Sequence, residues 1–115
     1  MNRIRPVMDQ LLSITSQDDI MELLIQILSN EEIVPEVGNF YTFIYHPKTP
    51  DITYDEFPLI ACTDIFQWGF RGANFHWNKY RNYTWEEVIG KLHLVNRVEL
   101  DELLSLQYGK FRINN

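Results

Sequence analysis

The segment Phe40-Tyr41-Thr42-Phe43-Ile44-Tyr45 decides the fold of this chain. It opens a region, residues 40–85, that contains 14 of the 16 aromatic residues. Aromatic and β-branched side chains favour strands, so residues 40–45 are predicted to form the first long strand. Further strands are predicted at Pro58–Thr63 and Ile65–Trp68, and the pattern allows a short edge strand at Ile52–Asp55. Short, closely spaced strands of this kind indicate a small antiparallel sheet that curls toward a barrel.

Two glycines punctuate the second half of this region. Gly69 and Gly72 are predicted to bracket a turn or a bulge before a strand at Ala73–Trp77, because glycine permits a positive φ or a close approach of two strands. Within that strand, alternation places the aromatic rings on the inner face and Asn74 and His76 on the opposite face.

Residues 1–30 are predicted to be helical. Pro6 suits the first turn of a short first helix. Ser16 is the expected N-cap of a second helix, since its hydroxyl can accept a backbone N–H of the first turn. That helix carries an apolar stripe with the spacing of one helical face: Ile20, Leu23, Leu24, Ile27 and Leu28. Met21 and Ile25 broaden the stripe, which indicates burial on more than one side or pairing with a partner.

The C-terminal third is predicted to return to helix. Thr84-Trp85-Glu86-Glu87 fits a capping box and predicts a helix that ends near Gly90. Arg97–Leu106 is predicted as a further helix, and Tyr108–Ile113 alternates like a terminal strand. The expected fold class is therefore α+β in a single domain of residues 1–115. Its predicted order is N-terminal helices (1–30), a small antiparallel curled sheet or SH3-like barrel (38–78), and C-terminal helices (84–107).

Length and composition fit one globular domain. A chain of 115 residues with 45% apolar and 14% aromatic residues can bury a core and is not disordered. No run of about 18 apolar residues is present, so no membrane-spanning helix is predicted. The basic start, Met1–Pro6, lacks the apolar stretch of a signal peptide. Cys62 is the single cysteine and lies in an apolar run, which favours a buried, reduced thiol and a reducing compartment.

The charge is unevenly distributed along the chain. The net charge is −6, but residues 1–70 carry −8 and residues 71–115 carry +2. The acidic total argues against a nucleic-acid binder, because phosphate contacts need cations. This uneven charge allows the two ends of the chain to attract each other between copies, or to face different partners.

No catalytic, cofactor or metal motif stands out. The acids that could act as paired carboxylates are Asp51, Asp55, Glu56 and Asp64, although loop acids in an acidic chain are normally just solvated. Cys62 and Asp64, two apart on a strand, would share a face and could meet His76 at a metal. A small metal-dependent hydrolase that uses Asp55, Asp64 and His76 is a third functional hypothesis. We predict no catalytic residue, no cofactor and no metal.

Two kinds of contact surface are compatible with the aromatic region. Single-strand binders interleave cations with stacking rings, and the cations that suit this role are Arg71, Lys79, Arg81, Lys91 and Arg97. The alternative to nucleic-acid binding is that Lys79 and Arg81 simply lie in a polar loop. Trp, Tyr and Arg also anchor protein interfaces, and the residues predicted to contact a partner protein are Trp68, Phe70, Arg71, Tyr80 and Trp85. Burial of every ring inside a monomer is the competing interpretation.

The motifs of residues 35–87 also carry a resemblance. They are Gly38, residues 41–45, residues 48–51, Tyr54-Asp55, Pro58-Leu59, Thr63-Asp64, residues 68–72, Asn74, His76-Trp77 and residues 83–87. With them the chain resembles a module of small proteins of T4-like marine bacteriophages, especially cyanophages, and residues 108–112 resemble the closing motif of that family. A shorter form of the pattern resembles part of larger phage proteins of virion assembly or DNA-end handling. The resemblance carries over no catalytic residue.

The resemblance and the aromatic surplus together set the functional expectation. It is a non-enzymatic bacteriophage protein that acts by protein–protein interaction in virion structure or assembly, located in the host cytoplasm or the virion. Its expected partners are other phage proteins or a second copy of the chain, and no membrane. The alternative is a nucleic-acid-binding accessory factor of phage DNA handling.

Overall fold

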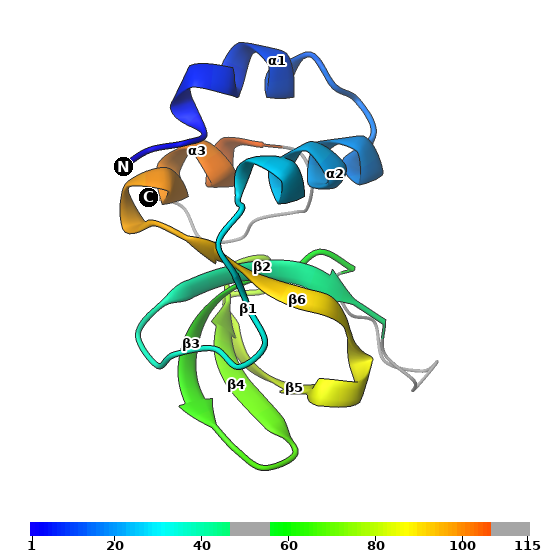
Figure 1. The fold of residues 1–115 in the computed structure, drawn as a ribbon, viewed down its shortest axis with the longest axis vertical. Helices are drawn as coiled ribbons and strands as arrows, with labels where there is room; N and C mark the ends of the chain where they lie inside the picture. Colours follow the sequence, from blue (N-terminus) through cyan, green and yellow to red (C-terminus); the bar gives the residue numbers. More distant parts are fainter. Residues whose placement is uncertain (47–55, 107–115) are drawn as a thin grey trace.

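The structure, a computed structural model, describes residues 1–46 and 56–106. A layer of helices lies against one side of a curled antiparallel sheet (Figure 1), which confirms the predicted α+β class and its helix–sheet–helix order. The helical elements are η1 (Arg5–Val7), α1 (Met8–Leu12), α2 (Gln17–Ile27), η2 (Trp85–Glu87), η3 (Arg97–Glu99) and α3 (Leu100–Ser105). The strands are β1 (Glu31–Glu32), β2 (Phe40–Tyr45), β3 (Leu59–Ile65), β4 (Gly69–Asn74), β5 (Lys79–Thr84) and β6 (Val88–Val95).

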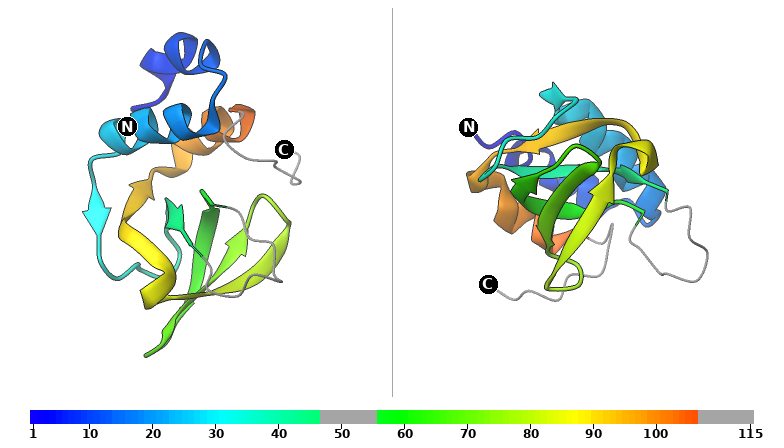
Figure 2. Two further views of the ribbon diagram at one scale, coloured as in Figure 1. Left: turned by 90° about the vertical axis from the view of Figure 1, so that its right-hand side faces the viewer. Right: turned by 90° about the horizontal axis from the view of Figure 1, so that it is seen from below.

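The sheet has the strand order β1-β6-β2-β3-β4-β5, with every neighbouring pair antiparallel. After β5, the single turn of η2 redirects the chain so that β6 returns beside β2. Figure 2 shows how strongly the sheet curls. Within residues 1–46 and 56–106 the ladder does not close, since β1 and β5 remain its two edges. Of the two predicted forms, the curled sheet therefore describes the pairing.

Strand β2 is buried on both of its faces, which explains why all its residues but Thr42 are aromatic or apolar. Its odd-numbered rings, Tyr41, Phe43 and Tyr45, are at most 1% exposed and line the concave side of the sheet. There Phe43 and Tyr83 meet edge to face with ring centroids 5.3 Å apart. The even-numbered Phe40 and Ile44 pack instead against the helices. We call the first set, with its neighbours, the concave core.

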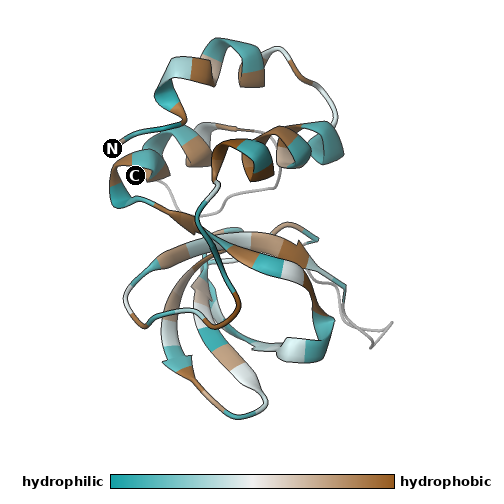
Figure 3. Cartoon of the chain, viewed as in Figure 1, coloured by the Kyte–Doolittle hydropathy of each residue, from teal (hydrophilic) through white to brown (hydrophobic). Residues whose placement is uncertain are grey.

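The helical layer forms the second core around α2. Ser16 is its N-cap as predicted, and accepts the Asp19 backbone N–H at 3.4 Å. In Figure 1, α2 lies between α1 and the sheet and runs beside α3. Ile20, Met21 and Leu24 are buried there among residues of all these elements. The broad apolar stripe therefore reflects burial on more than one side, and Figure 3 shows the opposite, polar flanks of these helices.

The predicted helix after Thr84 is wrong. The chain makes only the short turn η2, in which the Thr84 hydroxyl donates to the Glu87 carboxylate instead of capping a backbone N–H. Residues 88–95 then form β6, because Leu92 buries in the concave core while Val95 packs against the helices. Two-sided burial between neighbouring strands overrides the local capping signal. The predicted helical range 84–107 is correct only for its last part, η3 and α3.

Three smaller predictions also need correction. Ile65–Trp68 is not a strand: β3 runs to Ile65, and a tight turn follows in which the Phe66 N–H donates to the Gly69 carbonyl at 2.7 Å. Both glycines lie within β4, and the bulge is in β3 at Thr63, where the register shifts between residues 62 and 64. Residues 79–84, outside the predicted 38–78 sheet, form β5. The predicted strands at 52–55 and 108–113 lie outside the described residues.

Candidate interaction surfaces

An aromatic surface lies on the convex side of β3, β4 and β5, and we call it the aromatic face: Phe66, Trp68, Arg71 and Tyr80. Register pairs Ala73 with Tyr80 and Arg71 with Asn82, so alternation places Arg71 and Tyr80 on the same side of the sheet. The rings of Phe66 and Trp68 stack with centroids 4.9 Å apart and an interplanar angle of 7°. The Arg71 guanidinium lies 5.6 Å from the Phe66 centroid.

The aromatic face is open and slightly hollowed. Tyr80 is 70% exposed and Trp68 is 45% exposed. Beside Tyr80 lies a shallow hollow of about 370 Å³, lined by Thr63, Asp64, Arg71 and Tyr80. Monomers normally cover large rings, so two exposed rings beside a hollow mark this face as a candidate contact surface.

Polar contacts hold Arg71 in place on this face. Its Nε donates to Asn82 Oδ1 at 3.1 Å, and its terminal nitrogen lies 3.9 Å from Asp64 Oδ2. The bulge at Thr63 supports the arrangement, because the Thr63 hydroxyl contacts both the Asp64 carboxylate and the Arg71 carbonyl. The face therefore offers flat rings around an oriented guanidinium, which suits recognition better than proton transfer.

The structure separates the five predicted protein-contact residues. Trp68, Arg71 and Tyr80 come together on the aromatic face. Phe70 was wrongly included, because it is 0% exposed and packs against Phe43 and Tyr83 in the concave core. Side chains alternate between the two faces of β4, so Phe70 is buried while its neighbour Arg71 lies on the convex side. Trp85 lies elsewhere and is half-buried over Phe70, with its indole N–H donated to the Gln67 carbonyl at 2.8 Å.

The predicted nucleic-acid residues do not form one cationic surface. Arg71 is on the aromatic face, whereas Lys79 and Arg81 alternate with Tyr80 along β5 and so take its other side. Arg81 lies over the Trp77 ring at 5.2 Å. Lys91, on β6, lies 3.5 Å from the Glu31 carboxylate, and Arg97 is in η3 near the N-terminus.

The residues of the hypothetical metal site are also far from forming one group. Because the bulge at Thr63 changes the alternation, Cys62 points into the concave core while Asp64 is half-exposed on the convex side. His76 is buried instead, and its Nε2 accepts the Leu59 backbone N–H at 3.0 Å. In the described part of the chain no three His, Cys, Asp or Glu side chains gather into a metal-binding group. Asp51 and Asp55 lie outside it.

The predicted strand at Ala73–Trp77 is wrong beyond Asn74, where β4 ends and a turn follows, and its predicted face assignment is reversed. Asn74 and His76 are 1% exposed, whereas Phe75 and Trp77 are only half-buried. Asn74 is buried because its amide satisfies the turn: Oδ1 accepts the N–H groups of His76 and Trp77, and Nδ2 donates to the Tyr83 hydroxyl at 2.7 Å. Cys62 is buried as predicted, and burial raises the pKa of its thiol.

A second hollow was not predicted at all, and we call it the connector hollow. It has a volume of about 300 Å³ and lies between the β1–β2 connection and the start of β6. Its lining is almost wholly apolar: Ile33, Val34, Trp85, Val88, Gly90 and Leu92. These residues are scattered over 60 positions of sequence, and only the return of β6 beside β1 brings them together.

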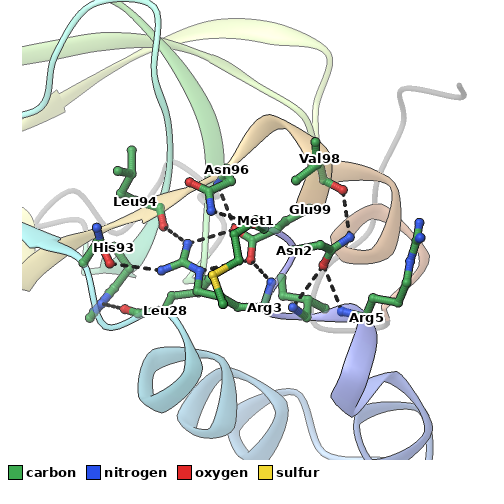
Figure 4. Close-up of polar contacts among 12 residues, drawn as sticks. Met1, Asn2, Arg3, Arg5, Leu28, His93, Leu94, Asn96, Val98 and Glu99 are labelled. Carbon is green, nitrogen blue, oxygen red and sulfur yellow. Dashed lines mark hydrogen bonds and ion pairs between the residues drawn. The ribbon is translucent and has the colours of Figure 1, made fainter.

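A polar network at the N-terminus was likewise not predicted. The Glu99 carboxylate is 0% exposed and accepts the backbone N–H, Nε and a terminal nitrogen of Arg3 at 2.6 to 3.1 Å, and the Asn96 N–H at 2.8 Å. Arg3 also donates to the Leu94 carbonyl at 2.9 Å. Figure 4 shows these bonds joining the first residues to the end of β6 and to η3. The network is structural and shares no residue with the lining of either hollow.

No family model, curated protein or solved structure matches this chain. Among the helices of residues 1–46 and 56–106, none has the length and apolar character needed to cross a membrane.

Proposed function

We propose that this chain is a non-enzymatic bacteriophage protein that works by binding another protein, through the aromatic face, in the virion or during its assembly. The observation that carries the proposal is the exposure of Tyr80 and Trp68 on the same face as the Arg71 guanidinium, which Asn82 holds in place. The phage setting follows from the resemblance of residues 35–87 and is part of the proposal.

The energetics of such a surface favour association. Trp, Tyr and Arg are the residue types that most often dominate interface energies, and each buried aromatic side chain removes a large apolar area from water. The stack of Phe66 on Trp68 and the bonds of Arg71 already restrain the side chains. Restrained side chains lose less entropy on binding, so more of the contact energy contributes to affinity.

The alternative is binding of single-stranded nucleic acid on the same rings. Exposed aromatics beside an arginine also serve as base-stacking platforms, and this favours the idea for Trp68, Arg71 and Tyr80. Against it, Lys79 and Arg81 take the other side of β5, Asp64 lies next to Arg71, and the net charge is −6. Protein binding therefore fits the face better.

Site-specific crosslinking tests the proposal. Benzoylphenylalanine replaces Tyr80, which is exposed enough to accept the larger ring, and Glu22 on the exposed side of α2 in a matched control. On illumination in infected host cells, we expect a discrete protein adduct from position 80 that is absent from position 22 and is lost when Trp68→Ala is added. Identical adducts from both positions, or none, would contradict it.

Two further measurements identify the partner class. Light scattering after size-exclusion chromatography shows whether purified protein self-associates, and Tyr80→Ala should then return it to monomer. Titration with labelled single-stranded DNA at low and high salt tests the alternative: binding that requires Arg71 and weakens steeply with salt would favour nucleic acid.

A further inference from the structure

Strand β5 is an open edge of the sheet. Among residues 1–46 and 56–106 it pairs with β4 alone and comes last in the strand order. Because an antiparallel ladder alternates, every second residue of β5 directs its backbone N–H and C=O away from β4. The Trp85 N–H donates to the Trp68 carbonyl at 3.2 Å in line with this ladder, so the odd-numbered residues face β4. The residues that face outward are Tyr80, Asn82 and Thr84.

The convex side of this edge offers side chains that are equally open to a partner. Asn82 Oδ1 accepts the Arg71 Nε at 3.1 Å, whereas Asn82 Nδ2 makes no hydrogen bond within the described part of the chain. Tyr80 is 70% exposed. An unpaired backbone, an unused amide donor and an uncovered ring therefore lie side by side. An unpaired strand edge of this kind is a template for another strand.

A second copy of β5 fits this edge in one antiparallel register. With the two-fold axis at Asn82, each Asn82 faces the other, and Tyr80 faces Thr84 of the second copy. All outward-facing residues then pair with outward-facing residues. A register centred one position to either side would set an outward-facing residue against Asn78, in the turn before β5 with a φ of 53°, or against Glu86 in η2. The edge is therefore complementary to itself.

The convex side chains also match in this register. Each Asn82 Nδ2 meets the Asn82 Oδ1 of the other copy, so the unused donor gains an acceptor. Tyr80 stands opposite Thr84 of the other copy, and an aromatic ring beside a β-branched side chain is a stabilising cross-strand pair. Thr84 pairs in turn with Gly69, which has no side chain to obstruct the ring. Phe66 bonds to the far side of Gly69, so the row continues into the aromatic face.

We infer that two copies of this chain join their sheets through β5, antiparallel and with the two-fold axis at Asn82. The joined edges merge the aromatic faces of both copies into one continuous convex surface. Pairing of one short strand buries a small area, so the association is weak and depends on concentration. The inference goes beyond the proposed function, because the edges pair in purified protein whether or not the aromatic face binds another protein.

Disulfide capture tests the register. Facing residues of a hydrogen-bonded antiparallel pair have Cα atoms about 5.5 Å apart, a separation that a disulfide spans. Asn82→Cys should therefore form a disulfide-linked dimer when the purified protein is mildly oxidised. The controls are Thr84→Cys, which faces Tyr80 rather than itself, and Glu22→Cys on α2; the buried Cys62 is common to all three proteins. We expect Asn82→Cys to crosslink about ten-fold or more faster than either control, because pairing holds its two thiols together.

A charge swap tests the two-fold axis. Asn82→Asp sets like charges opposite each other in a pair of identical copies, and so does Asn82→Lys. Where light scattering shows the unaltered protein as a dimer, we expect each variant alone to be monomeric and an equal mixture of the two to recover the dimer. Circular dichroism checks that each variant is folded. Equal crosslinking of Asn82→Cys and its controls, or one scattering mass for the unaltered protein, both variants and their mixture, would overturn the edge contact.

Discussion

At the scale of single residues, buried polar side chains affect the stability of the fold more than exposed ones do. His76 is 1% exposed, and its Nε2 must stay unprotonated to accept the Leu59 N–H. Burial lowers the pKa of His76 to about 4, although a backbone hydrogen bond at Phe57 opposes the shift. The folded protein therefore holds this histidine neutral, while the unfolded chain protonates it near pH 6.5.

Stability should fall between pH 6.5 and pH 4 because of His76. The folded pKa lies below the unfolded one, so the full contribution is present above pH 6.5 and is lost as the unfolded state gains its proton first. The total loss should be about 3 kcal/mol by pH 4. Urea unfolding at pH 7, 5.5 and 4 measures it. His76→Gln keeps an acceptor without a titrating group, and an unchanged pH slope in this variant would refute the assignment.

The ion pair between Arg3 and Glu99 is the second residue-scale feature. Burial disfavours ionisation of Glu99, but the hydrogen bonds from Arg3 and Asn96 outweigh it and lower the pKa of this carboxyl. The contribution of Glu99 to stability is therefore fully present above the ordinary pKa range of a glutamate, and it is lost as the pH falls below that range. The pH range in which Glu99 loses its contribution lies below most of the range in which protonation of His76 lowers stability.

Replacement of Arg3 should be far more costly than replacement of Arg5. Arg3→Met leaves a carboxylate that is 0% exposed without its cation, which should cost about 3–5 kcal/mol. Arg5→Met is the control: Arg5 also pairs with an acid, Glu102, but is 76% exposed, so its loss should cost less than about 1 kcal/mol. Chemical denaturation at pH 7 compares the two. Equal effects would show that the Arg3 network adds little.

At the scale of elements, β4 depends on two glycines that neighbouring strands crowd. A Cβ at Gly69 would lie 1.8 Å from the Tyr83 backbone oxygen, and a Cβ at Gly72 would lie 2.9 Å from the Ile60 side chain. The first obstacle is backbone of the paired strand and cannot move without breaking the pairing. The second is a side chain that can shift.

Alanine substitutions should therefore differ between these positions. Gly72→Ala should destabilise by about 1–3 kcal/mol through overpacking, and Gly69→Ala should destabilise more. Ala73→Ser, on the convex side of the same strand, should change the free energy of unfolding by less than about 1 kcal/mol. Urea unfolding gives the order. A Gly69→Ala protein as stable as Gly72→Ala would contradict the close approach of β4 to β5.

At the scale of the whole molecule, the helical layer and the sheet share their cores. Leu59 and Val95 come from strands but pack among helical residues such as Leu24 and Leu103. The Arg3 network adds a polar tie between the N-terminus and η3. Neither layer can bury its apolar face alone, so the molecule should unfold as one unit.

Two spectroscopic probes can test this cooperativity. All three tryptophans, Trp68, Trp77 and Trp85, belong to the sheet region, so their fluorescence reports on that part alone. Far-UV circular dichroism follows mainly the helices. We expect coincident urea transitions, with Arg3→Met shifting both equally. Loss of the helical signal at lower urea than the fluorescence change would show independent layers.

Local sequence patterns correctly predicted the elements that are determined by nearby residues in the chain. Ser16 caps α2 with a side chain that reaches only its own first turn, and residues 40–45 form β2 because their aromatic and β-branched character suits a strand in any tertiary context. Thr84 also carries a local helix signal, yet β6 forms after it because residues 88–95 gain more by pairing with β2 and burying Leu92. A local signal fails where long-range pairing offers larger burial.

The sequence by itself determined the α+β order, the Ser16 cap of α2 and the aromatic content, since these depend on neighbours along the chain. Tertiary structure alone decided which rings are exposed. The bulge at Thr63 separates Cys62 from Asp64, alternation hides Phe70 beside exposed Arg71, and the return of β6 builds the connector hollow from distant residues. Register and bulges assign each side chain to a face, and they follow from how strands pair in space.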